Sequence, residues 1–113
     1  MNIRELANAI GAEVMTKSVE LSREVSAGYT CDLLSWVMAH GKEGMAWITV
    51  QTHMNVIAVA TLHDMSCVIV PEGNRVEDDV VQKADEEGVA VLTTGLTAFE
   101  ICGRMYQAGV AAQ

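Results

Sequence analysis

The chain contains three short apolar runs, at Met45 to Val50, Cys67 to Val70 and Val89 to Leu92. Each run leads through a short polar or Gly/Pro break into a segment whose apolar residues recur at helical spacing. Apolar runs of this length that alternate with helical patterns are typical of parallel strands buried on both faces. The pattern therefore predicts an α/β fold, a mainly parallel sheet with helices on both faces.

The amino-terminal segment predicts a helix that begins after Asn2 and ends at Gly11. Asn2 and Glu5 have the spacing of a capping box. Apolar residues recur at i, i+3, i+4 and i+7: Ile3, Leu6, Ala7 and Ile10. Residues 13 to 16 predict a short strand. Val25 to Thr30 predicts another, in which Gly28 would let a second segment approach the backbone closely.

The loops after the strands contain residues that often cap helices. Asp32 is expected to cap a short helix with one apolar face: Leu33, Trp36 and Val37. Thr52 is expected to cap a helix over 53 to 62, in which almost every face is apolar. Such a helix is buried on several sides, and we expect it, or the region Leu33 to Met38, to form an interface between two copies.

The last two helices carry similar capping signals. Asn74 and Glu77 repeat the capping-box spacing before a helix that runs to about Glu87 with an acidic outer face, and Gly88 is placed to end it in the left-handed conformation. Thr97 is expected to cap the final helix. One side of that helix carries three large or reactive residues: Phe99, Cys102 and Tyr106.

The length of 113 residues predicts one domain, 1–113, because chains of about 100 to 150 residues usually form a single core. Half of the residues are apolar but only 4% are aromatic, so the core must be built from aliphatic residues and seven Met. The mean hydropathy is positive. A chain this small and apolar is expected to bury part of its surface in a homodimer.

The formal net charge of −8 argues against nucleic acid as a partner, since that affinity comes from clustered Lys and Arg. The sequence has no apolar run of about 20 residues that could span a membrane, and its amino terminus lacks the layout of a signal peptide. We therefore expect a cytoplasmic protein without membrane contact. Three widely spaced cysteines, expected to be buried thiols, suit a reducing compartment: Cys31, Cys67 and Cys102.

A ligand site is predicted at the carboxyl ends of the parallel strands, where helix N-termini present unpaired N–H groups. Three loops supply its residues: Gln51, Thr52 and His53; Gly73 and Asn74; Thr93, Thr94 and Gly95. Their amides and hydroxyls suit a small anionic or nucleotide-like ligand. The alternative is that these residues only cap helices and make turns.

Recognisable catalytic motifs are absent from the sequence. It contains neither a P-loop nor a Gly-x-Gly-x-x-Gly pattern, and no nucleophile lies in a known catalytic context. His63 and Cys67 form a close pair of metal-ligating residue types, but the sequence has no third and fourth ligand at a spacing typical of a zinc site. We expect a non-catalytic domain with no metal and no cofactor.

Four stretches of the sequence resemble the DRTGG domain family. They are Leu21-Ser-Arg-Glu-Val-Ser-Ala-Gly-Tyr29, Asp32-Leu-Leu-Ser35, Ala46-Trp-Ile-Thr-Val-Gln-Thr-His53 and Val91-Leu-Thr-Thr-Gly-Leu-Thr-Ala-Phe-Glu100. The family is similar to the amino-terminal domain of HPr kinase/phosphorylase, and its domains also occur inserted in CBS-domain pyrophosphatases. The resemblance implies an α/β regulatory domain that pairs with another copy and lacks the catalytic half of the kinase.

The motif that names the family is altered in this chain. Ser22 stands where an Asp is usual, Arg23 is kept, and Ala27-Gly28 replaces a double Gly. Two functional hypotheses follow. The domain is a ligand-sensing homodimer, or it is an interaction module that docks on a partner enzyme or regulatory protein without any small ligand.

Overall fold

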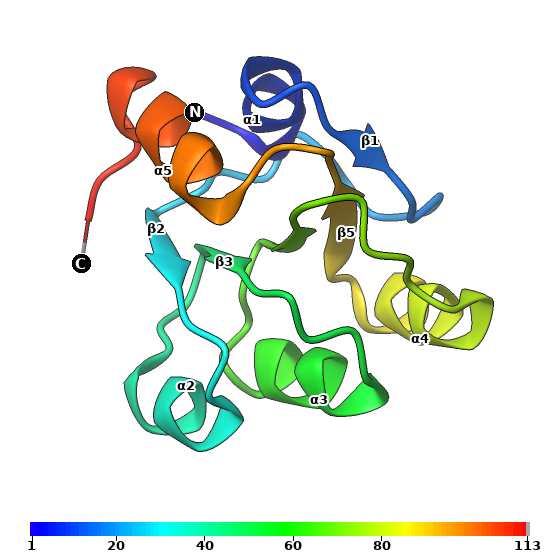
Figure 1. The fold of residues 1–113 in the computed structure, drawn as a ribbon. Helices are drawn as coiled ribbons and strands as arrows, with labels where there is room; N and C mark the ends of the chain where they lie inside the picture. Colours follow the sequence, from blue (N-terminus) through cyan, green and yellow to red (C-terminus); the bar gives the residue numbers. More distant parts are fainter. Residues whose placement is uncertain (113) are drawn as a thin grey trace.

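The central sheet has five strands in the order β1-β5-β4-β3-β2 (Figure 1). In this computed structural model, which describes residues 1–112, the strands have these bounds: β1 Glu13–Val14, β2 Ala27–Thr30, β3 Met45–Ile48, β4 Cys67–Val70 and β5 Ala90–Thr93. Strands β2 to β5 are parallel, and β1 pairs antiparallel with β5, with Glu13 opposite Thr93. The predicted mainly parallel sheet is confirmed.

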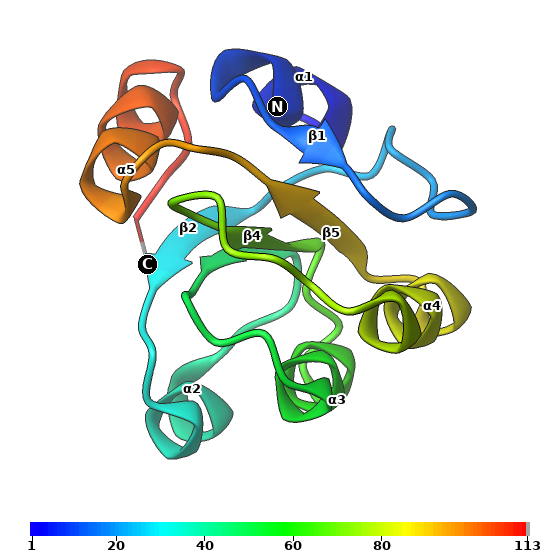
Figure 2. The same ribbon diagram turned by 45° about the vertical axis from the view of Figure 1, so that its right-hand side comes forward.

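Helices cover both faces of the sheet, as predicted (Figure 2). On one face lie α1 (Ile3–Ala9) and α5 (Ala98–Gln107). On the other lie α2 (Leu34–His40), α3 (Met54–Leu62) and α4 (Asp78–Glu87). The three connections that join parallel strands therefore all cross the same face, whereas the chain leaves β5 for the opposite face.

Successive strand residues are buried in two separate hydrophobic cores, one on each face of the sheet. Trp47 and Val68 point to the layer of α2, α3 and α4, whereas Ile48 and Ile69 point to the layer of α1 and α5. All four side chains are at most 2% exposed. Because successive strand residues face opposite sides and both sides are buried, the strands read as continuous apolar runs.

Three of the predicted helix ends are confirmed. Asn2 accepts a hydrogen bond from the Glu5 amide and the Glu5 carboxylate accepts one from the Asn2 amide, which completes the capping box of α1. The Thr97 hydroxyl accepts from the Glu100 amide at 3.2 Å. Gly88 ends α4 with φ of +77°, a conformation that glycine adopts without steric cost.

Two predicted caps are wrong. His53, not Thr52, is the N-cap of α3, and its side chain makes no cap hydrogen bond. The Asn74 side chain donates to the Pro71 carbonyl at 2.8 Å, which closes a turn, and α4 begins only at Asp78. Cross-loop hydrogen bonds and the positive φ of Gly73 hold the residues after β4 in this turn, so they cannot enter the helix.

The expected role of Asp32 is also wrong. Its carboxylate accepts from the Thr49 hydroxyl at 2.8 Å and from the Val50 amide at 2.9 Å, so it ties the loop after β2 to the end of β3. Leu33 takes the N-cap position of α2. The side chains of Leu33 and Trp36 are 61% and 53% exposed, whereas Val37 is fully buried. These three apolar residues therefore do not share a buried face.

Within residues 1–112, none of the helices has both the length and the apolar character that crossing a bilayer requires.

Candidate functional site

The carboxyl ends of β4 and β5 form a topological switch point, because the chain continues from β4 to α4 on one face and from β5 to α5 on the other. Ligands in open α/β sheets bind at such points. An open hollow of about 310 Å³ lies there. Gly11 from the α1–β1 loop and Glu13 from β1 line it. Five of the eight predicted site residues also line it: Gly73, Asn74, Thr93, Thr94 and Gly95.

Two backbone hydrogen bonds close the crevice beneath this hollow. The Glu72 amide donates to the Leu96 carbonyl at 2.9 Å, and the Gly73 amide donates to the Thr94 carbonyl at 3.0 Å. Glu72 and Gly73 both have positive φ, at 59° and 67°. The tie between the loops turns the switch point into a shallow surface site.

The other three predicted residues lie apart from this hollow, in the loop between β3 and α3. Gln51, Thr52 and His53 border a separate space of about 10 Å³, whose other lining is apolar core. Since β3 and β5 flank β4, their ends lie about 10 Å apart. The structure thus divides the predicted site into two groups on the same edge of the sheet.

Several side chains of the predicted site already have intramolecular partners. The Gln51 side-chain amide donates to the Asp32 carbonyl, and the buried Thr94 hydroxyl donates to the Ile10 carbonyl and accepts from the Leu96 amide. Among the described residues, no hydrogen bond involves the side chain of Thr52, His53 or Thr93. These three are the members that could bind a ligand without breaking an existing contact.

The N-termini of the helices that follow β3 and β4 differ electrostatically. The first turn of α4 carries Asp78 and Asp79, and the Asp79 carboxylate accepts from the Val80 amide. The first turn of α3 has no acidic residue and no side-chain cap. The positive end of a helix dipole favours an anion only where no carboxylate already neutralises it, so an anionic group would bind better at α3.

Arg23, the retained residue of the altered motif, has a structural role that the sequence pattern did not reveal. Its guanidinium donates to the Asp64 carboxylate at 3.1 Å and to the carbonyls of Asp64 at 2.6 Å and Met65 at 3.4 Å. Asp64 has φ of +53° in the tight turn between α3 and β4. Arg23 therefore clamps this turn.

Gly28 is also explained by close packing, as predicted. Its amide donates to the Ala111 carbonyl at 2.9 Å, which holds the carboxyl-terminal segment against the outer edge of β2. A Cβ at position 28 would lie 3.0 Å from the Met105 Cε. An alanine at this position would require the end of the Met105 side chain to shift slightly.

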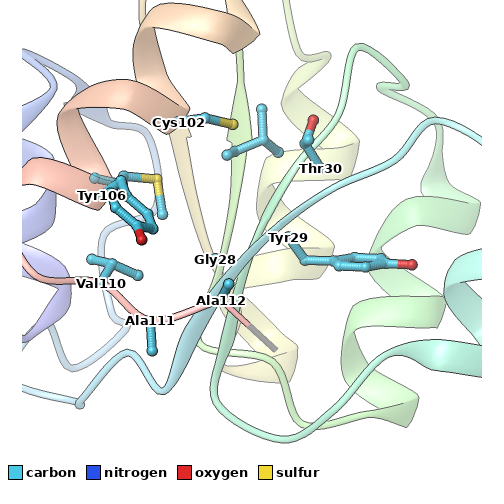
Figure 3. Close-up of a pocket in the computed structure, with 10 residues that line it drawn as sticks. Gly28, Tyr29, Thr30, Cys102, Tyr106, Val110, Ala111 and Ala112 are labelled. Carbon is cyan, nitrogen blue, oxygen red and sulfur yellow. The ribbon is translucent and has the colours of Figure 1, made fainter.

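A second hollow, of about 160 Å³ and mainly apolar, opens beside β2 and α5 (Figure 3). Gly28 and Thr30 line one side, Cys102 and Tyr106 another, and Val110 to Ala112 the third. Burial raises the pKa of the Cys102 thiol. The sequence could not predict this hollow, because β2 and Ile48 of β3 meet the carboxyl-terminal stretch 102–112, which is distant from both along the chain.

His63 and Cys67, the close pair of metal-ligating residue types, have structural surroundings of their own. The His63 Nε2 lies 2.8 Å from the Met38 carbonyl. Cys67 is buried in β4, and burial raises the pKa of its thiol to about 12, against a smaller opposing effect of Arg23. Residues 1–112 contain no cluster of three or more His, Cys, Asp or Glu that could hold a metal ion. The expectation of buried thiols holds for Cys67, while Cys31 and Cys102 are only partly buried.

The family model of the DRTGG domain matches residues 5–108, and the chain belongs to this family. Among solved structures, it is similar to the CBS and DRTGG domains of the regulatory region of Clostridium perfringens pyrophosphatase, a structure complexed with the activator diadenosine tetraphosphate. The TM-score is 0.76 at 15% identity over 94% of this chain, which spans 46% of the pyrophosphatase chain. Curated protein sequences include no match.

Proposed function

We propose that this domain is a regulatory, ligand-sensing module that acts as a homodimer and binds a small nucleotide-like ligand at the carboxyl ends of its strands. The main support is the shared fold with a regulatory region that was solved with a nucleotide activator. The hollow at the switch point between β4 and β5 supplies a location for such a ligand.

The two groups of site residues suit the two parts of a nucleotide. The hollow contains the Thr93 hydroxyl and the exposed Glu13 carboxylate, which accepts hydrogen bonds from ribose hydroxyls or base amines but repels phosphate. The uncapped N-terminus of α3, with Thr52 and His53, is the better place for the anionic part. Because no Lys or Arg lines either hollow, we expect weak binding that requires the nucleoside as well as the phosphate.

A thermal-shift screen of nucleotides, nucleosides, inorganic phosphate and carboxylates tests this proposal. We expect a nucleotide to raise the melting temperature, and Thr52→Val and Thr93→Val to reduce that shift. Thr30→Val is the matched control, because Thr30 lies at the other hollow and should leave the shift unchanged. No shift with any compound, or equal shifts in all variants, would refute the ligand site.

The alternative function is an interaction module that docks on a partner enzyme or regulatory protein. An observation that favours it is the exposure of large apolar side chains on α2 and just before it, where Leu33 is 61%, Trp36 53% and Met38 51% exposed. The Trp36 ring also stacks on His40 at 4.2 Å. If no compound shifts the melting temperature and Trp36→Asp abolishes binding to a partner enzyme, this alternative replaces the ligand-sensing proposal.

We further propose that the domain acts by binding and has no catalysis of its own, in a reducing, cytoplasmic environment that suits its three free thiols. The pure chain should transfer no labelled phosphate from ATP to HPr. Transfer above a no-protein control would overturn this part of the proposal.

A further inference from the structure

The outer face of α5 carries aromatic side chains that have no partner layer within the described residues. Phe99 is 89% exposed and Tyr106 is 75% exposed. Phe99 is the only phenylalanine in a chain of which 4% is aromatic. Aromatic residues are costly to leave in water and are enriched at interfaces. Cys102 and Gly103 lie between them on the same face of the helix.

The four residues of this face have a symmetric spacing. Phe99 and Tyr106 flank Cys102 and Gly103 at equal sequence distances. If two copies of α5 cross antiparallel about a two-fold axis at Cys102 and Gly103, Phe99 of one copy faces Tyr106 of the other. We propose that α5 forms an isologous dimer interface with a second copy of this chain, in which each Phe99 ring enters the apolar hollow beside the partner's Tyr106.

The hollow is large enough to accept the Phe99 ring of a second copy. It measures about 160 Å³ and opens beside Cys102 and Tyr106, and Val110 also lines it (Figure 3). A cavity of about 150 Å³ with apolar walls accepts a benzene ring. Phe99 lies one helical turn from Cys102 on the same face, so the hollow and the ring that fits it are carried by one helix.

Gly103 is consistent with a close approach of two helices. Glycine inside a helix costs about 1 kcal/mol relative to alanine. No atom lies within 4 Å of a Cβ built at position 103, so the fold of one copy does not require glycine there. A second helix that crosses at this point would require it, because a side chain would hold the two backbones apart.

Charge on α5 does not oppose a second copy as the occupant. Glu100 and Arg104 form an ion pair at 2.8 Å within one helix. At about 100° per residue, both lie more than about 90° around the helix from the centre of the aromatic face. The face itself carries no charged residue, so its contact with a second copy brings no like charges of α5 together despite the chain's net charge of −8.

This inference rests on the homodimer of the proposed function and specifies its surface. The first test is light scattering of Phe99→Asp at micromolar concentration. We expect the dissociation constant of the dimer to rise by about 30-fold or more, as for the loss of an aromatic anchor. Leu62→Asp is the matched control, because Leu62 is 66% exposed on α3 and its change should leave the dimer intact.

The second test is disulfide trapping with copper phenanthroline and dioxygen as the oxidant. The native Cys102, which lies at the proposed crossing, should give a covalent dimer on a non-reducing gel, whereas Cys102→Ser should not, and neither should Ala58→Cys on α3 in the Cys102→Ser background. Cross-linking through Ala58→Cys but not through Cys102 would overturn the α5 interface and keep the homodimer. A monomer in light scattering would refute the homodimer as well, without bearing on the thermal-shift test of the ligand.

Discussion

Arg23 shows how a residue of a recognisable motif stabilises a backbone turn. Its side chain is 29% exposed and donates to two backbone carbonyls as well as to the Asp64 carboxylate. Deleting the guanidinium leaves these carbonyls without a charged donor, and hydrogen bonds to charged groups contribute about 1.5–3 kcal/mol. The carboxylate of Asp64 is 67% exposed, so the ion pair itself contributes little.

We therefore expect Arg23→Ala to lower the free energy of unfolding by about 1.5–3 kcal/mol and Asp64→Asn to lower it by at most about 1 kcal/mol. Asn is chosen because it tolerates the positive φ of Asp64. Urea denaturation measures both values. Arg75→Ala, which removes an exposed pair with Glu77 at 3.9 Å, is the control and should change stability least. Equal losses for Arg23→Ala and Arg75→Ala would contradict the clamp.

Cys67 predicts a dependence of stability on alkaline pH. Its thiol pKa rises from 9.0 to about 12 because the thiol is buried. Between these pH values the unfolded chain loses the thiol proton while the folded chain keeps it. The free energy of unfolding should therefore fall as pH rises above 9, by at most about 1.4 kcal/mol per pH unit from this group. In urea titrations, Cys67→Ala should show a shallower fall than the wild type; parallel curves would contradict the prediction.

At the scale of elements, two threonines before helices differ in whether they cap the helix that follows. Thr97 and Thr52 both follow a strand and precede a helix, but only the Thr97 hydroxyl accepts a first-turn amide. Thr97→Ala should lower the free energy of unfolding by about 1 kcal/mol, the usual cost of a lost N-cap, whereas Thr52→Ala should change it by less than about 0.5 kcal/mol. Chemical denaturation of the two variants makes the comparison, and a larger loss for Thr52→Ala would show that the two roles are reversed.

The elements also show where sequence patterns were sufficient. The strand β4 and the helix α1 follow from local signals, an apolar run and a capping box, which act within a few residues. The caps expected at Asp32 and Asn74 failed because those side chains found partners in other loops or in the turn after β4. Asp and Asn compete for several backbone partners, and only the packed loops decide among them.

At the scale of the whole molecule, association of two copies should stabilise the fold by mass action. If only the folded domain dimerises, the melting temperature must rise with protein concentration. Differential scanning calorimetry over a hundredfold concentration range should show this rise for the wild type. The rise should be smaller for Phe99→Asp and retained for Leu62→Asp. A melting temperature of the wild type that does not depend on concentration would contradict a dimer of this kind.

The sequence by itself determined the α/β class, the parallel strands and the helices on both faces, because these depend on periodicity along the chain. It also placed Gly73, Asn74 and Thr94 at the carboxyl ends of strands. Only the tertiary structure decided that the eight predicted residues fall into two groups and that the apolar hollow beside Cys102 exists. Strand order and long-range loop contacts decide which residues meet in space, and these arise from the packing of segments that are distant in the sequence.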